Sequence, residues 1–505
     1  MKKSSSLSPV KSTKTNLFAV RGMHLDLRIQ VMPIQALRSH VQTMAEMGLN
    51  TLLIEWEASF PYQKHAIIPN QYAYTSQEIK SFIGYCKTLG IDVIPLQQCF
   101  GHIEYILQHE RYAHLREDQT DLCQLCPSKI EEALLEFKGI FKEIAEAHPS
   151  PYIHIGGDET YLLGHCKVCQ EKAKEFGKSK LYVDYFKQIA EMVVKMGKRP
   201  LIWADMLLKH PETVHEMPKE SVFVDWNYGW ATNRFGELSK IKENQFEFWG
   251  APALRSHPDN HSLTRWENHF NNLRDYLPFT RQSGFKGIIL TSWSTSGLYG
   301  YQWANTGEVS EIYPNRRVYP LPAFRILLEA FSFAIQQEDR FVPKNFVIQY
   351  AQSRFGLTSR EGGLLWDALT EEAVAIEPGC RVAPILKKSK KALAVIQKLK
   401  PNSNREEFEH LRLMTETRVN YLQFKKLEEE VNSKNFKDSL RSRKVVELKK
   451  ILKVAEKLNQ RFLKLNCKNL YPGELKEETD YRLQKLRRLL KRLARSGRAG
   501  FKISK

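Results

Sequence analysis

The segment YIHIGGDET, Tyr152–Thr160, decides the fold that we expect for this chain. It begins as a short apolar run typical of a β-strand and ends in two adjacent carboxylates, Asp158 and Glu159. Strict alternation would place Tyr152, His154 and Asp158 on one face of the strand and the isoleucines on the other. A polar column that ends in a carboxylate is typical of the interior of a parallel barrel, where active sites lie at the C-terminal ends of the strands.

Seven similar runs lie outside this segment, and most of the stretches between them have helical spacing. The expected strands are Phe18–Arg28, Thr51–Glu57, Asp92–Gln97, Tyr152–Asp158, Pro200–Asp205, Val222–Trp226, Phe246–Gly250 and Gly287–Trp293. The expected helices are Pro33–Met47, Ser76–Leu89, Lys129–Ala147, Ser179–Met196, Ser262–Ser283 and Leu321–Gln336. Eight strands that alternate with helices over about 320 residues favour a (β/α)₈ TIM barrel. A doubly wound open sheet with similar alternation is the alternative.

The formal net charge of +19 comes from the last quarter of the 505-residue chain. From Pro384 to Lys505 there are 34 Lys and Arg against 14 Asp and Glu, whereas the rest of the chain has 42 and 43. From about Val342 onward the spacing is helical and no run is typical of a strand. We therefore expect a disordered leader over residues 1–17, a catalytic (β/α)₈ barrel over 18–340 and a basic, mainly α-helical C-terminal module over 341–505.

The last expected helix, Glu474–Ser496, carries a leucine stripe and a basic opposite face. Packing of the stripe on the rest of the protein is favoured over binding of the helix to a polyanion or a membrane surface. Few aromatic residues lie between its Lys and Arg residues, which makes nucleic acid an unlikely partner. No stretch approaches the roughly 18 apolar residues of a membrane helix. We expect a cytoplasmic protein that does not bind membranes, with a homodimer left open.

The motif HIGGDE, His154–Glu159, resembles the H-x-G-G-D-E signature of glycoside hydrolase family 20, the retaining β-N-acetylhexosaminidases. The resemblance extends over roughly residues 18–330. Further matching positions are Arg21-Gly22 with Asp26 and Arg28 in the first strand, Gly101-His102 after the third, Trp203 after the fifth and Trp293 after the eighth. The run Glu55–Tyr62 is similar to the divergent hexosaminidase D branch of that family.

This resemblance implies an exo-acting hydrolase that removes terminal β-linked N-acetylgalactosamine or N-acetylglucosamine without a catalytic cofactor. The 2-acetamido group of the glycan substrate would act as the nucleophile and form an oxazolinium ion. Glu159 would be the general acid and base, and Asp158 would orient the acetamide. The expected substrate-binding residues are Arg21, Glu57, His102, Trp203, Trp226, Tyr228 and Trp293, with Tyr228 as a substitute for a seventh-strand tyrosine that is absent here.

Three alternatives stay open. Asp205 and Asp225 also lie near strand ends, and either would be a conventional nucleophile if the substrate has no acetamide. The barrel would be a catalytically silent sugar-binding protein if the acid pair were inactive. The basic helical module would itself be the functional part if the protein bound a polyanion.

Two C-x-x-C pairs form a separate pattern: Cys123 with Cys126, and Cys166 with Cys169. They follow the third and fourth expected strands, so both pairs should lie on adjacent loops of one barrel face. Four cysteines match a structural zinc site without an open coordination position. Four free thiols and two disulfides are the alternatives.

Overall fold

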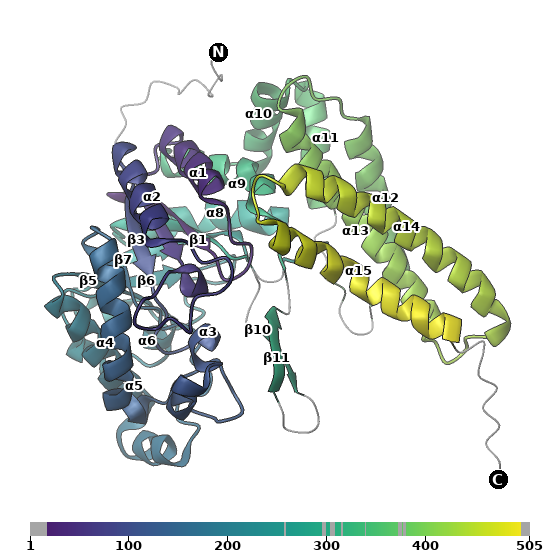
Figure 1. The fold of residues 1–505 in the computed structure, drawn as a ribbon. Helices are drawn as coiled ribbons and strands as arrows, with labels where there is room; N and C mark the ends of the chain where they lie inside the picture. The colour runs from purple at the N-terminus through teal and green to yellow at the C-terminus, as the bar shows by residue number, and fades with distance from the viewer. Residues whose placement is uncertain are drawn as a thin grey trace, which may run out of the picture.

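The computed structural model describes residues 18–256, 259–294, 299–303, 309–314, 317–338, 340–371, 376 and 380–495. It consists of a barrel and a helical module that lie side by side (Figure 1). The expected leader over residues 1–17 lies outside the described residues. No helix among the described residues is both long and apolar enough to cross a membrane.

Parallel strands form the barrel, and pairing of the first strand with the last closes it. The strands are β1 (Val20–Asp26), β2 (Thr51–Glu55), β3 (Asp92–Leu96), β4 (Tyr152–His154), β5 (Arg199–Trp203), β6 (Val222–Trp226), β7 (Glu247–Ala251) with β8 (Ala253–Arg255), and β9 (Gly287–Ser292). β7 and β8 are separated by Pro252 and both pair with β9, so together they fill the seventh position. The predicted eight-stranded TIM barrel is confirmed, and the open sheet is excluded by the β1–β9 pairing.

Strand β4 is shorter than predicted. The alternation that we expected to continue to Asp158 stops at His154, because Gly156 and Gly157 have φ values of 76° and 106°. Both conformations favour glycine. A Cβ at Gly156 would lie 1.8 Å from Oε1 of Gln98, and one at Gly157 would lie 2.6 Å from the Tyr182 hydroxyl. The two glycines therefore allow the close approach of protein side chains and re-aim the chain before Asp158.

Helices surround the barrel. They are α1 (Ile34–Glu46), α2 (Ser76–Thr88), α3 (Glu104–Leu107), α4 (Ile130–Ala147), α5 (Lys167–Lys195), α6 (Asp205–Lys209), α7 (Ser239–Lys242), α8 (Trp266–Gln282) and α9 (Arg325–Ile335). Helix α5 begins earlier than predicted and is interrupted at Gly177, where φ is 85°. An antiparallel hairpin of β10 (Tyr299–Trp303) and β11 (Val309–Pro314) follows the barrel and was not predicted.

Two layers of apolar side chains hold the barrel together. Alternate residues of the strands fill its interior: Leu53, Ile94, Leu96, Leu201, Trp203, Val222, Val224, Trp249, Ala251 and Ile289. The residues between them, such as Leu52 and Ile54 of β2, face the outer layer that the helices cover. Because the interior is packed with side chains, substrate can reach the strands only at their ends.

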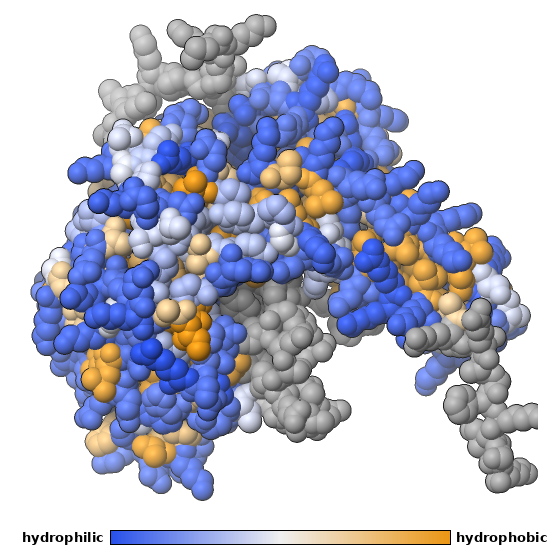
Figure 2. Space-filling view, viewed as in Figure 1, coloured by the Kyte–Doolittle hydropathy of each residue, from blue (hydrophilic) through white to orange (hydrophobic). Residues whose placement is uncertain are grey.

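The helical module consists of α10 (Pro343–Phe355), α11 (Ser359–Thr370), α12 (Val382–Lys398), α13 (Arg405–Val431), α14 (Arg441–Asn466) and α15 (Pro472–Arg495). The leucine stripe of α15 is buried against Phe424 of α13 and Leu448 of α14. Figure 2 shows hydrophilic residues over most of this module, with an apolar strip along α14 and α15. The stripe thus packs within the protein, and the basic residues of α15 lie largely on its outer side.

The N-terminal end of α15 is anchored to the barrel by buried charges. Arg317 pairs with Glu474 at 3.4 Å and with Glu478 at 3.3 Å. The amide of Gln30, in the loop after β1, donates to Oε1 of Glu478 at 3.1 Å, and its oxygen accepts from Arg255 of β8. These contacts join the helical module to the place where the barrel closes.

Candidate active site

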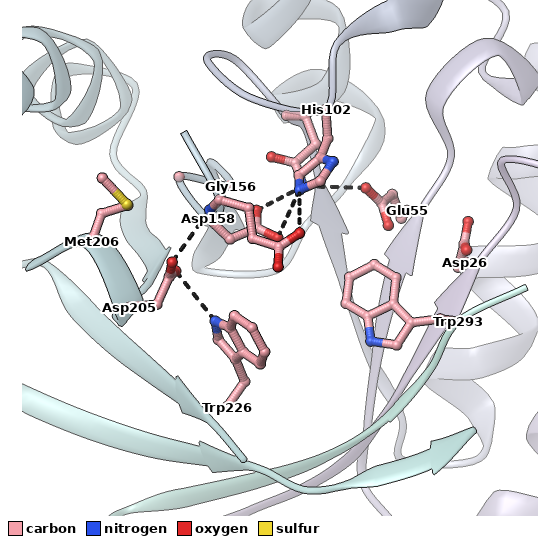
Figure 3. A network of polar contacts seen from close by, with 12 residues as sticks. Asp26, Glu55, His102, Gly156, Asp158, Asp205, Met206, Trp226 and Trp293 are labelled. Carbon is pink, nitrogen blue, oxygen red and sulfur yellow. Dashed lines mark hydrogen bonds and ion pairs between the residues drawn. The ribbon is translucent and has the colours of Figure 1, made fainter. Parts of the chain in front are cut away.

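Polar and aromatic side chains from most of the strands converge at the C-terminal mouth of the barrel. Figure 3 shows Asp158, Trp226 and Trp293 around a common space, with His102 beside Asp158. The residues connected by contacts at the mouth are Asp26, Arg28, Glu55, Glu57, Gln98, His102, Asp158, Glu159, Trp203, Asp205, Trp226, Tyr228 and Trp293. All but one of the predicted catalytic and substrate-binding residues are in this set.

The two acids share one imidazole. Nε2 of His102 lies 3.2 Å from Oδ2 of Asp158 and 3.5 Å from Oε2 of Glu159. Asp158 also accepts a hydrogen bond from the amide of Gln98 at 3.3 Å. The Glu159 side chain is 28% exposed and that of Asp158 only 10%. Glu159 is therefore the more accessible of the two acids.

This contact controls the ionisation of all three groups. Burial alone would raise the pKa of Asp158, but His102 outweighs it and holds that pKa below its ordinary value. The same balance of burial against His102 lowers the pKa of Glu159. Burial opposes the charge on His102, yet the two carboxylates raise the pKa of this imidazole well above its usual range. The contact thus favours the charged form of each of the three groups.

Three mouth residues have left-handed backbone conformations: Glu57 with φ 44°, His102 with φ 54° and Glu159 with φ 50°. Such conformations are unfavourable for residues with a Cβ and are maintained by the surrounding structure. For Glu159 that support includes Asp205, whose Oδ2 accepts the backbone N–H of Glu159 at 3.3 Å. Strain concentrated in this way is typical of functional sites.

A buried ion-pair network lies on the β1 and β2 side of the mouth. Arg28 contacts Asp26 at 3.2 Å, Glu57 at 3.7 Å and Glu55 at 3.8 Å. Its guanidinium also lies over the ring of Trp293, 5.0 Å from the ring centroid. Burial raises the pKa of Glu57 well above its usual range, although Arg28 opposes this. Glu57 therefore lies at the mouth as predicted, next to a cation that the prediction had given no role.

Aromatic side chains form the wall opposite the acids. Nε1 of Trp293 donates to the Tyr228 hydroxyl at 2.8 Å, and Nε1 of Trp226 donates to Asp205 at 3.2 Å. The rings of Trp226 and Tyr228 lie 5.1 Å apart. Trp203 is buried below them against His154, at 4.3 Å between ring centroids. The structure thus brings together all four predicted aromatic residues.

Arg21 is the exception among the predicted substrate-binding residues. It lies near the N-terminal end of β1, where its guanidinium donates to the carbonyls of Phe18 at 2.8 Å and Gly48 at 3.2 Å. The prediction that Arg21 contacts sugar was therefore wrong, because that end of the strand is the opposite end of the barrel. Arg28, in the same motif, follows the strand and reaches the mouth. Active sites lie at the C-terminal ends of barrel strands, a rule that would have selected Arg28.

The alternative nucleophiles, Asp205 and Asp225, are both buried and hydrogen-bonded to neighbouring residues. Asp205 is fully buried, and burial raises its pKa to about 6 although Lys209 lies 3.2 Å away. Asp225 accepts from the Tyr276 hydroxyl at 2.7 Å, and burial raises its pKa to about 7. Their contacts make them supports of neighbouring residues rather than exposed nucleophiles.

The predicted cysteine site differs in one member. The described residues bring Cys126, Cys166 and Cys169 together, but the fourth corner is the carboxylate of Glu117 and not Cys123. The backbone N–H of Cys123 instead donates to Asp121. The prediction of four cysteine ligands was therefore wrong for Cys123. Glu117 belongs to no C-x-x-C pair, so the spacing of cysteines gave no signal for it.

Comparison with known proteins agrees with this site. Residues 18–248 match the catalytic domain of glycosyl hydrolase family 20. Hexosaminidase D of Bos taurus is 32% identical over 294 residues, which cover 54% of this chain and 84% of the bovine protein. Hexosaminidase D of Homo sapiens is 30% identical over 299 residues, which cover 56% of this chain and 61% of the human protein.

A similar solved structure is that of beta-N-acetylhexosaminidase from Bacteroides fragilis NCTC 9343. It has a TM-score of 0.45 and 18% sequence identity, over 55% of this chain and 60% of that chain. The family assignment rests on the sequence relatives, since the bovine protein is matched over most of its length. The chain belongs to glycosyl hydrolase family 20 and is a glycoside hydrolase.

Proposed function

We propose that this protein is a retaining β-N-acetylhexosaminidase that removes terminal N-acetylgalactosamine or N-acetylglucosamine from glycans by substrate-assisted catalysis. One observation carries the proposal: Asp158 and Glu159 share the imidazole of His102 opposite an aromatic wall at the barrel mouth. The family membership and the hexosaminidase D relatives support the same activity.

Asp158 supplies the fixed negative charge. It is buried, held by Gln98 and His102, and its pKa lies below the ordinary value of a carboxyl group. A carboxylate held in this way accepts the N–H of the 2-acetamido group and turns the acetamide oxygen toward the anomeric carbon. It then stabilises the positive charge that develops on that nitrogen as the oxazolinium ion forms.

Glu159 transfers the protons. The leaving-group oxygen has to be protonated as the glycosidic bond breaks, so Glu159 must carry a proton in the substrate complex. His102, whose pKa the two carboxylates raise, lies 3.5 Å from Glu159. Binding of a sugar removes water from the mouth, and this desolvation favours the protonated form of Glu159 over its charged form. After the leaving group departs, the Glu159 carboxylate accepts a proton from the water that opens the oxazolinium ion.

The aromatic wall encloses the acetamide. Trp226 and Trp293 offer apolar surface to its methyl group above the buried Trp203, and the Tyr228 hydroxyl, held by Trp293, hydrogen-bonds its carbonyl oxygen. Arg28 and Glu57 lie on the other side of the mouth and bind sugar hydroxyls. A substrate that fits this wall needs an acetamide at C2, which favours N-acetylhexosamines over plain hexoses.

A panel of aryl glycosides tests the proposal. The protein should hydrolyse 4-nitrophenyl β-N-acetylgalactosaminide or β-N-acetylglucosaminide, and a thiazoline that mimics the oxazolinium ion should inhibit it competitively. The matched control is 4-nitrophenyl β-glucoside, which has the same leaving group but no acetamide and should not be turned over. Equal rates on the glucoside would exclude the acetamide as nucleophile, and binding without turnover of any member would favour the catalytically silent alternative.

A further inference from the structure

A compact group of metal-binding side chains lies outside the active site. It consists of Glu117, Cys126, Cys166 and Cys169, which we call the cysteine–glutamate cluster. Each residue offers one ligand atom, and these four atoms all lie within 4.8 Å of one another. Glu117, Cys126 and Cys169 are buried and Cys166 is partly exposed. None of these side chains has a part in the proposed hydrolysis.

We propose that the cysteine–glutamate cluster binds one zinc ion and that this ion fixes the loop that follows the catalytic acids. The ligands come from two separate stretches of chain. Glu117 and Cys126 belong to the segment after β3, whereas Cys166 and Cys169 lie at the beginning of α5, after β4. None of these four ligands is an active-site residue, so zinc binding here needs neither the substrate nor the proposed mechanism.

Three ligand-to-ligand distances within the cluster match those of a tetrahedral zinc site, and all of its ligand atoms lie within 4.8 Å of one another. Zinc binds sulfur at about 2.3 Å and carboxylate oxygen at about 2.0–2.2 Å, so tetrahedral ligands lie about 3.8 Å apart for two sulfurs and about 3.5 Å apart for sulfur and oxygen. Sγ of Cys126 lies 3.7 Å from Sγ of Cys166 and 3.5 Å from Sγ of Cys169. Sγ of Cys169 lies 3.5 Å from Oε2 of Glu117. Cys126 and Cys169 thus already lie at zinc-site distances from their neighbours in the cluster.

The neighbouring groups orient the ligands. Oε1 of Glu117 accepts the backbone N–H groups of His165 and Cys166, both at 2.8 Å, which leaves Oε2 turned toward the sulfurs. Cys166 is the N-cap of α5, and its sulfur accepts the N–H of Cys169 at 3.4 Å. The positive end of a helix stabilises thiolates, the form in which cysteine binds zinc. Such surrounding hydrogen bonds are a regular feature of protein metal sites.

The types of ligand also limit which metal ions the cluster can bind. Three thiolates select a soft or borderline metal, which excludes calcium and magnesium. Four protein ligands fill a tetrahedral site and leave no position for water or substrate, so the ion is structural. Cys123 does not take part, since it belongs to no group of ligand atoms found among the described residues.

The position of the cluster gives the ion its effect. Cys166 lies seven residues after Glu159 in the chain, and Cys126 lies near Cys123, whose carbonyl accepts the N–H of Ile103, next to His102, at 3.3 Å. Between them the amide oxygen of Gln124 accepts the N–H of Leu162 at 2.8 Å. The N–H of Leu125 donates to the carbonyl of Phe100, next to the loop that carries His102. Zinc would therefore hold together the two loops that bring His102 to the acids.

Metal analysis of the purified protein is the direct test. We expect about one zinc per chain, measured by mass spectrometry of the elements. After removal of zinc by a chelator under reducing conditions, addition of Co²⁺ should give the absorption of a tetrahedral site with three thiolate ligands. This measurement uses the wild-type chain and does not depend on activity, so its outcome is separate from that of the proposed hydrolysis.

Single cysteine variants identify the ligands. C166S should lose the zinc, because Cys166 belongs to the cluster. C123S is the matched control, since it also changes one cysteine of a C-x-x-C pair, and it should retain the zinc. E117Q should weaken Co²⁺ binding and leave the number of bound thiolates unchanged. If C166S fails to fold, the Co²⁺ spectrum of the wild type still decides the number of thiolates. Absence of zinc together with no Co²⁺ binding by the reduced protein would overturn the proposal, as would a disulfide between Cys126 and Cys169 or loss of zinc in C123S.

Discussion

The imidazole of His102 lies 3.2 Å from the carboxylate of Asp158, close enough to fix the charge of both groups. His102 lowers the pKa of Asp158, and Asp158 in turn raises the pKa of His102. Because the same nitrogen lies 3.5 Å from Glu159, the catalytic acids are not independent. Their titration belongs to the cluster, and removal of one member changes the others.

Replacing His102 by alanine should shift the pH profile as well as lower the rate. The imidazolium lowers the pKa of Asp158, so its loss raises that pKa. Since Asp158 has to be ionised, the acidic limb of kcat/KM should move to higher pH. The exposed His114 provides the control, because H114A removes an imidazole that lies away from the acids. An unchanged acidic limb in H102A would show that His102 does not set the ionisation of the pair.

Replacing Glu159 by glutamine should lower kcat by about 10²–10⁴-fold, the usual contribution of general acid–base catalysis. The loss should be smaller with a dinitrophenyl glycoside, whose leaving group needs little protonation. E243Q makes the same chemical change at an exposed position and should have no effect. An equal loss with both leaving groups would assign Glu159 a role other than proton donor.

The contact between Trp293 and Tyr228 can be measured by a double-mutant cycle. W293F removes the donor of the 2.8 Å hydrogen bond and Y228F removes the acceptor. Each single variant should lower kcat/KM, and the double variant should lose less than the product of the two effects, because both changes break one interaction. Independent effects that multiply would mean that the two side chains act separately on the substrate.

Gly156 should tolerate alanine far less than Gly177 does. Both have positive φ values, 76° and 85°, so a Cβ costs roughly 1–3 kcal/mol of backbone strain at either position. Only at Gly156 would that Cβ also lie 1.8 Å from Gln98, whereas nothing lies within 4 Å at Gly177. G156A should therefore have the lower melting temperature, measured by calorimetry. Equal melting temperatures would show that Gln98 moves aside without cost.

The buried charges between α15 and the barrel should contribute to stability. E478Q removes a fully buried carboxylate that Gln30 and Arg317 both contact, and we expect a loss of about 1–3 kcal/mol in the free energy of unfolding. The control K476Q breaks the exposed pair with Asp480 and should change stability by less than about 1 kcal/mol. Unfolding by guanidinium compares the two. Equal effects would mean that the buried pair stabilises the protein no more than a surface pair does.

The barrel was predictable because apolar runs and helical spacing repeat along the chain, and β6 was predicted with its bounds unchanged. The acid pair and the aromatic residues were also predictable, since each follows a strand and strand ends meet at one mouth. The end of β4 was not. Alternation describes a strand only while φ is negative, and the backbone conformations of Gly156 and Gly157 depend on Gln98 and Tyr182, which are distant in sequence.

Two residues that the prediction missed in their supporting roles also depend on long-range contacts. Glu117 joins the cysteine–glutamate cluster because the N–H groups of His165 and Cys166 bind its carboxylate, a contact that no local motif contains. Asp205 supports Glu159 through a backbone N–H, which any residue type would supply. Motifs therefore identified the residues that line the barrel mouth better than those that hold them in place.

Gln30 has a consequence for the order in which the molecule assembles. It lies just after the first barrel strand, yet one of its hydrogen bonds reaches Glu478, 448 positions further along the chain. During synthesis on the ribosome, β1 emerges long before α15 exists. The hydrogen bond between Gln30 and Glu478 therefore cannot form until nearly all of the described residues have been made. Contacts of such separation slow folding. We therefore expect the β1–β9 pairing to close the barrel first, with Gln30 and Arg255 exposed to water until α15 docks.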